Sequence, residues 1–148
     1  MSLEARQALV DAPGLFFQIE ACKTDLLDKS LTSTYLIELL TYLVIERGWN
    51  YELTCVRTGH HDDGPHGHFG GFACDGWPLR TRTAGDWCAS TDARFRWFLD
   101  DLSRAPALYQ VGLAGSADLP ANRTLLGRFY FPDSGADHVH IGATDGSF

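Results

Sequence analysis

The sequence predicts an α+β domain in which a mostly antiparallel sheet is flanked by two main helices. Two segments carry apolar residues at spacings of three and four, which is typical of amphipathic helices. Several shorter segments alternate or are rich in β-branched and aromatic residues, which is typical of strands. The expected order is helix, strand, strand, helix, strand, strand, which favours an α+β fold over repeated βαβ units.

The N-terminal part of the chain contains the first main helix. Residues 1–12 are expected to form a short amphipathic helix, and residues 15–22 an extended segment. The main helix begins after residues 32–34 and ends at Gly48, because glycine readily adopts the conformation that terminates helices. Its buried face consists of Leu36, Ile37, Leu39, Leu40, Leu43 and Val44.

The middle of the chain contains two strands and the second main helix. Residues 51–57 and 72–77 are expected to be strands, and residues 58–71, rich in Gly, His, Asp and Pro, form the loop between them. A Ser-Thr-Asp cap precedes the second helix. Trp97 is expected in the core together with the apolar face of this helix, which consists of Phe95, Phe98, Leu99 and Leu102.

The C-terminal part is expected to complete the sheet. Residues 108–113 form a strand, residues 115–124 a loop, and residues 125–131 a further strand. Residues 138–143 alternate between polar and apolar side chains and form the last strand.

The bulk properties favour one domain spanning residues 1–148. Residues 51–143 hold the motifs described below, and residues 1–30 are either part of that core or an N-terminal extension. The net charge of −7 argues against a nucleic-acid groove and against binding to anionic membranes. Apolar runs stay short of the roughly 20 residues of a membrane span, and the N-terminus lacks a signal-peptide pattern, which predicts cytoplasmic synthesis.

The four cysteines are irregularly spaced, and no CxxC pair occurs. This spacing predicts buried thiols rather than disulfides at Cys22, Cys55, Cys74 and Cys88. A cysteine nucleophile at Cys74 is not expected, because strand alternation turns it away from the side chain of Asp75. Ser90 and Ser134 lie near acidic residues, but neither occurs in a G-x-S-x-G turn.

All six histidines fall in two groups, which favours a metal site over scattered structural roles. His138 and His140 are two residues apart on an expected strand, so both rings address one site. His68 and Asp75 bracket a glycine-containing turn. Three ligands, His68, Asp75 and His140, would leave a fourth tetrahedral position open, as in catalytic zinc sites.

Other interpretations of the histidines stay open at this point. Without the first group, the second could be two surface histidines on an edge strand. The remaining polar residues of the loop are expected to be a solvated surface, although a second metal site and a wall of the substrate cleft are alternatives. These residues are His60, His61, Asp62, Asp63 and His66.

Two motifs carry a resemblance to a known family. Residues 68–75 read HFGGFACD and fit H-x-x-G-x-A-x-D, and residues 137–140 read DHVH and fit a closing D-H-x-H. The pair resembles the zinc D-alanyl-D-alanine carboxypeptidases and L-alanyl-D-glutamate endopeptidases, whose fold is shared with the hedgehog signalling domain. His66 occupies a position where that family usually has serine.

The resemblance implies a role for each residue of the two motifs. It implies that His68, Asp75 and His140 bind Zn²⁺, that Asp137 is the general base and that His138 stabilises the developing oxyanion. Arg57 resembles the arginine that holds the substrate in the family, although it lies closer to the first motif than the family spacing. Its alternatives are Arg80, Arg82 and Arg128.

Two functions follow from this resemblance. The first is a zinc metallopeptidase that hydrolyses peptide bonds of peptidoglycan stem peptides, as a phage endolysin or a virion-associated tail lysin that reaches the cell wall after lysis or within a virion. The second is a non-catalytic zinc-bearing structural or wall-binding component of a phage tail or other assembly, with other tail proteins as partners. The presence of Asp137 and His138 favours the enzyme, because a structural zinc site needs neither.

Overall fold

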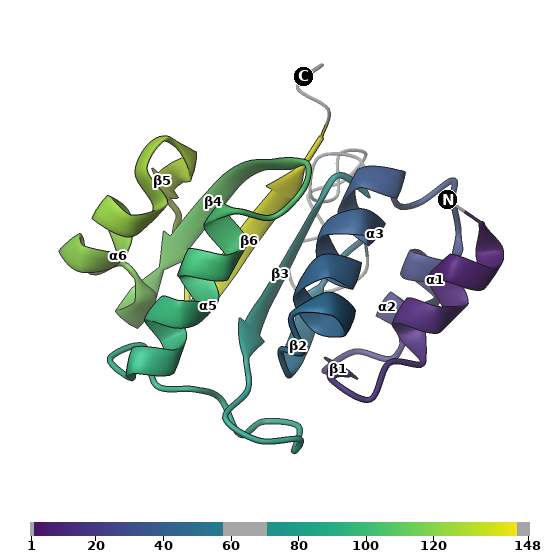
Figure 1. The fold of residues 1–148 in the computed structure, drawn as a ribbon, viewed down its shortest axis with the longest axis horizontal. Helices are drawn as coiled ribbons and strands as arrows, with labels where there is room; N and C mark the ends of the chain where they lie inside the picture. The colour runs from purple at the N-terminus through teal and green to yellow at the C-terminus, as the bar shows by residue number, and fades with distance from the viewer. Residues whose placement is uncertain (1, 58–70, 145–148) are drawn as a thin grey trace.

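The structure, a computed structural model, describes residues 2–57 and 71–144. Within these ranges six strands form one sheet in the order β1-β2-β3-β6-β4-β5, with helices packed beside it (Figure 1). The predicted α+β class is confirmed. The strands are β1 Leu15–Phe17, β2 Tyr51–Cys55, β3 Ala73–Pro78, β4 Leu108–Ala114, β5 Tyr130–Pro132 and β6 His138–Ala143.

The sheet is mixed, with an antiparallel centre and parallel edges. The pairs β2–β3, β3–β6 and β6–β4 are antiparallel. The outer pairs β1–β2 and β4–β5 are parallel. Parallel neighbours require a crossover connection, and helical segments lie between the members of each outer pair in the chain. The predicted antiparallel character therefore holds for the centre of the sheet.

The N-terminal segment contains two helices where one was predicted. Helix α1 spans Leu3–Val10, and the Oγ atom of Ser2 caps it by accepting from the amide of Ala5. The extended segment predicted over residues 15–22 is limited to β1, because the chain turns into helix α2 at Ala21–Leu27. Cys22 and Leu26 lie one helical turn apart and are both fully buried, which stabilises α2 against the core.

The first main helix is confirmed, with a change of helix type along its length. Helix α3 spans Thr34–Thr41 and begins at Ser33, whose Oγ accepts from the amide of Leu36. It continues as a π-helical segment, η1, over Tyr42–Glu46. The segment ends before Gly48, which has a φ of 75° that residues with a Cβ rarely adopt.

The second main helix, α5, spans Ala93–Ser103 and is also confirmed. Asp92 caps it by accepting from the amide of Arg94. The predicted burial of Trp97 is wrong, because 61% of its surface is exposed. Residues at 95, 98, 99 and 102 share one helical face, whereas Trp97, rotated by about 200° from Phe95, lies on the opposite side of the helix.

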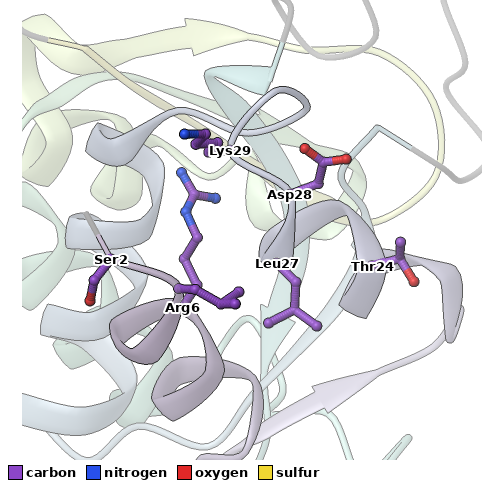
Figure 2. A pocket seen from close by; sticks show the side chains of 7 residues that line it. Ser2, Arg6, Thr24, Leu27, Asp28 and Lys29 are labelled. Atoms are coloured by element: carbon purple, nitrogen blue, oxygen red, sulfur yellow. The ribbon is translucent and has the colours of Figure 1, made fainter.

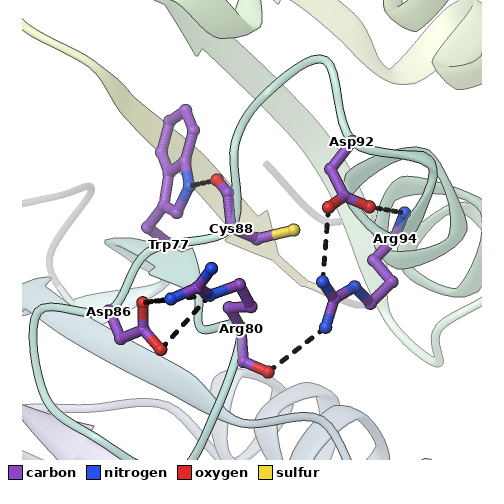
Figure 3. Close-up of polar contacts among 6 residues, drawn as sticks. All are labelled: Trp77, Arg80, Asp86, Cys88, Asp92 and Arg94. Atoms are coloured by element: carbon purple, nitrogen blue, oxygen red, sulfur yellow. Dashed lines mark hydrogen bonds and ion pairs between the residues drawn. The ribbon is translucent and has the colours of Figure 1, made fainter.

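The connection from β3 to α5 is held by specific polar contacts (Figure 3). The indole Nε1 of Trp77 donates to the carbonyl of Cys88 at 2.7 Å, and its ring stacks on Trp87 with centroids 5.4 Å apart. Trp77 is buried. Arg80 forms an ion pair with Asp86 at 3.0 Å. These contacts fix where the chain leaves the sheet and enters α5.

The segment between β4 and β5 differs most from the prediction. The loop predicted at 115–124 and the strand predicted at 125–131 are wrong over most of their lengths. Pro120 begins a helix because its fixed φ suits the first helical turn, and Asn122 and Leu126 point inward one turn apart. The observed elements are η3 Gly115–Ala117, α6 Pro120–Leu126 and η4 Gly127–Phe129.

One face of the sheet forms the core with α3 and α5, which lie side by side across it (Figure 1). From the sheet this core receives Val111, Leu113, Val139 and Ile141, none of which is exposed. The four cysteines are buried thiols, as predicted. Because side chains alternate along β6, its histidines lie on the opposite face of the sheet.

Candidate metal centre

The pairing of β3 with β6 brings together predicted site residues that are far apart in sequence. Asp75 lies directly opposite His140 in this antiparallel pair, and Gly76 lies opposite Val139. Directly opposed residues point to the same face of a sheet, and so does His138, two residues before His140. The fold therefore assembles Asp75, His138 and His140 at one place.

The carboxylate of Asp75 lies between the two imidazoles. Its Oδ1 is 3.3 Å from Nδ1 of His140, and its Oδ2 is 4.0 Å from Nε2 of His138. The side chains are nearly enclosed, with exposed fractions of 3% for Asp75, 8% for His140 and 9% for His138. The three groups thus form a compact polar cluster with little access to bulk water.

The remaining histidines cannot be placed in this cluster. His68, the third predicted zinc ligand, lies outside the described residues, as do His60, His61 and His66. Across residues 2–57 and 71–144, no three His, Cys, Asp or Glu side chains are grouped so that they could hold a metal ion. The described part of the chain contains two of the three predicted ligands.

Close packing holds the ring of His140 in place. Gly112 lies opposite His140 on β4, and the ring of Phe131 fills the space that a Cβ at Gly112 would occupy. That ring packs edge-on against His140, with centroids 5.4 Å apart. The side-chain amide nitrogen of Gln110 lies 3.2 Å from Nε2 of His140. The same side chain fills the space that a Cβ at Gly142 would occupy. Nδ1 of His140 is thereby directed towards Asp75.

His138 is held through both of its ring nitrogens. Nδ1 is 2.9 Å from the carbonyl oxygen of Ala136, and Nε2 is 2.8 Å from Oδ2 of Asp133. A carbonyl oxygen only accepts hydrogen bonds, so Nδ1 donates to Ala136, and Nε2 shares a hydrogen bond with Asp133. The two contacts fix the orientation of the His138 ring.

Asp137, the predicted general base, lies at the surface one residue before β6. Its carboxylate accepts from the amide of Ser116 at 2.7 Å and from the hydroxyl of Ser116 at 2.6 Å. It packs where a Cβ at Gly115 would lie, and Gly115 has a φ of 62°. Each carboxylate oxygen retains a second lone pair, so Asp137 can still accept a proton.

Arg57, the predicted substrate-binding arginine, is half-buried just after β2. Its backbone amide donates to Oδ2 of Asp25 at 3.1 Å, which fixes the chain at this point. Cys55, at the end of β2, lies opposite Asp75. Arg57 is therefore two residues beyond the position that pairs with Asp75.

The three alternative arginines have different surroundings. Arg80 lies beyond the far end of β3 and is paired with Asp86 (Figure 3). Arg128 is exposed and lies over the ring of Phe129, 4.8 Å from its centroid. Arg82 is exposed in the connection that follows β3. Arg57 is the one of the four that follows β2, the strand on which Cys55 lies opposite Asp75.

Cys74 is excluded as a nucleophile by its environment. It lies opposite Ile141 on the core face of the sheet and is fully buried. Burial, with the negative charge of Asp75 as a smaller cause, raises the pKa of the Cys74 thiol well above its ordinary value. The thiol therefore stays protonated, and the strand-alternation argument from the sequence is confirmed.

A cavity of about 550 Å³ lies between α1 and the turn that follows α2 (Figure 2). Arg6 and Lys29 contribute basic groups to its wall. The guanidinium of Arg6, however, donates to the carbonyl of Leu26 and to both oxygens of Thr32, so it ties α1 to this turn. The cavity contains none of the predicted site residues.

The sequence did not reveal three residues that complete the cluster: Asp133, Gln110 and Phe131. Gln110 was within a predicted strand, but its face could not be related to His140 without the register of β4 and β6. Asp133 and Phe131 depend on the parallel pairing of β4 with β5, which has no local signal in the sequence. Asp133 follows Pro132 directly, and this proline is the one local sign that a strand ends there.

Comparisons of the chain with family models, curated proteins and solved structures found no match. Among the described residues, no helix combines the length and apolar character that crossing a membrane requires.

Proposed function

We propose that this protein is a zinc-dependent metallopeptidase that hydrolyses peptide bonds of peptidoglycan stem peptides, with the fold of the family that its two motifs resemble. The observation that carries the proposal is the meeting of Asp75 and His140 on adjacent antiparallel strands. These are the carboxylate and the closing histidine to which the resemblance assigns zinc. The setting suggested by the resemblance is a phage endolysin or virion-associated tail lysin.

The positions of the two donor atoms fit a zinc ion. Zinc bonds to histidine nitrogen and carboxylate oxygen are about 2.0–2.2 Å long, and at a tetrahedral angle two such donors lie about 3.3–3.5 Å apart. Nδ1 of His140 and Oδ1 of Asp75 are 3.3 Å apart. His68 would be the third ligand.

The roles of the other residues follow from where their polar groups lie. A bound zinc ion would contribute Lewis acidity for hydrolysis of a carbonyl compound. Asp137 would take the proton of the attacking water, and Arg57 would hold the substrate in place. His138, whose ring is held by the carbonyl of Ala136 and the carboxylate of Asp133, would stabilise the developing oxyanion, the role that the resemblance assigns to it.

The proposal is tested by measuring metal and activity on the same preparation. The metal content of the purified protein is determined by mass spectrometry, and release of free amines from peptidoglycan is followed with and without a chelator. We expect near-stoichiometric zinc and chelator-sensitive release. Zinc without cleavage would replace the enzyme with the zinc-bearing structural or wall-binding component. A protein without zinc at neutral pH would overturn both.

A further inference from the structure

Asp133 reaches the candidate site by a route that crosses strand β4. In the β4–β5 pair Leu113 lies opposite Pro132, and the amide of Asp133 donates to the carbonyl of Leu113. In the β4–β6 pair Ala114 lies opposite His138. Asp133 and His138 therefore flank Ala114 from either side. Their backbones are two strand spacings apart, about 9.6 Å, and only their side chains meet. The small side chain of Ala114 lets the carboxylate and the imidazole meet above it.

The contact between these two side chains is short and partly shielded from water. Oδ2 of Asp133 lies 2.8 Å from Nε2 of His138, within the range of charge-assisted hydrogen bonds. The exposed fractions are 25% for the side chain of Asp133 and 9% for that of His138. The carbonyl of Ala136 fixes Nδ1, so the two contacts together set the plane of the ring.

The carboxylate nearest to His138 in sequence does not make this contact. Asp137 is turned to Ser116, whose amide and hydroxyl both donate to it. Gly115 makes room for Asp137 at that turn, because a Cβ at this position would collide with the carboxylate. The fold thus separates two acidic residues that the sequence places close together, with Asp133 at the histidine and Asp137 at the turn.

We propose that Asp133 is a positioning residue, which holds His138 in the orientation in which it faces the Asp75–His140 pair. Its effect on turnover rests on the peptidase function proposed above, whereas its effect on the imidazole does not. Asp133 acts through His138, from which it lies 2.8 Å away.

The first test is spectroscopic and uses the full-length protein as purified. Histidine ring nitrogens are labelled with ¹⁵N, and the signals of His138 are assigned by their loss in His138→Gln. We expect a hydrogen-bonded Nε2 proton signal in the parent, its loss in Asp133→Ala, and its retention in Asp133→Asn, which still offers an oxygen acceptor. Asp86→Asn, which removes an equally paired carboxylate at the far end of β3, should leave the ring signals unchanged. Unchanged His138 signals in Asp133→Ala would overturn the proposal.

The second test asks whether the effect passes through His138. For an outer residue that orients a site, we expect a loss of about 10- to 100-fold in kcat in Asp133→Ala, with KM and zinc content retained and a smaller loss in Asp133→Asn. In the double variant with His138→Ala, the Asp133→Ala change should cost nothing further. Additive losses would show that Asp133 acts independently and would overturn the proposal. If the parent has neither zinc nor activity, the proposed function fails and the ring signals alone decide the role of Asp133.

Discussion

Val139 and Ile141 point from strand β6 into the core beneath α3 and α5, where neither is exposed, whereas His138 and His140 point from the same strand to the opposite face. The apolar side chains are buried in the hydrophobic core, so they contribute to the stability of the fold. Each histidine instead has named partners at fixed atoms, such as Asp75 and Asp133. Alternation along this six-residue strand thus places the side chains that stabilise the fold on one face and the candidate site residues on the other.

The largest effect is expected where the polar face loses a zinc donor. His140→Ala should reduce bound zinc from near-stoichiometric to near zero and activity to background, because Asp75 loses the donor beside it. Metal content and amine release measure this. Ile141→Ala, one residue away on the core face, is the matched control and should keep its zinc. Full zinc occupancy in His140→Ala would refute the assignment of this ligand.

A smaller effect is expected at Asp137, which precedes β6 and belongs to neither face. Asp137→Ala should retain zinc and lose kcat by about 10²- to 10⁴-fold, the range expected for removal of a general base. Steady-state kinetics and metal analysis on one preparation test this. Ser116→Ala serves as the control, because it removes one of the contacts to Asp137 and leaves the carboxylate in place. A fully active Asp137→Ala protein would show that another group takes the proton.

The core face is tested by Ile141→Ala. This change leaves a cavity at a fully buried site and should lower the free energy of unfolding by about 2–5 kcal/mol. Denaturant unfolding followed by circular dichroism gives the value. A loss below about 1 kcal/mol would mean that the core collapses around the gap and that the two faces contribute more evenly than their burial indicates.

An intermediate effect is expected at Gly112, where the polar face is packed. A Cβ there would lie 2.6 Å from the ring of Phe131 and would push that ring against or away from His140. Gly112→Ala should cost about 1–3 kcal/mol of stability, as overpacked sites do, and should also weaken zinc binding. In Gly112→Ala/Phe131→Leu the smaller side chain should restore part of both losses. Unchanged stability in Gly112→Ala alone would contradict the packing described here.

The smallest effect is expected at Trp97, outside both faces of β6. Its side chain is exposed on α5, so Trp97→Ala should change stability by no more than about 0.5 kcal/mol. Thermal unfolding with unchanged zinc content tests this. A loss above about 1 kcal/mol would indicate contacts that the exposed position does not explain.

Local pattern was sufficient for the elements whose burial repeats regularly. The bounds of β6 were predicted at 138–143 and observed at His138–Ala143, because alternation there is complete. Helix α3 was found from its apolar spacing and serine cap. The short helices α2 and α6 were missed, since each buries only a few side chains and gives too little periodicity to separate from a loop or strand.

The candidate site was predictable in part. Asp75, His138 and His140 were expected together, and strand pairing brings them together. The contact of Asp133 with His138 depends on two registers across β4, one parallel and one antiparallel, and neither leaves a local trace in the sequence. The positions of Asp137 and Arg57 are known, while their predicted roles await the experiments above.

The indole stack between β3 and α5 has a practical consequence for measuring these variants. Trp77 lies against Trp87 and Phe95, and Trp49 packs edge-on against Phe98, so the buried Trp77 and the half-buried Trp49 both contact α5. The sequence has no tryptophan after position 97, and β4, β5 and β6 all follow it. Changes in intrinsic fluorescence will therefore report mainly on the packing around Trp77 and α5. A substitution on the polar face of β6 that leaves the emission spectrum unchanged has therefore left the packing around α5 intact. Its effect on zinc content or turnover can then be attributed to the site.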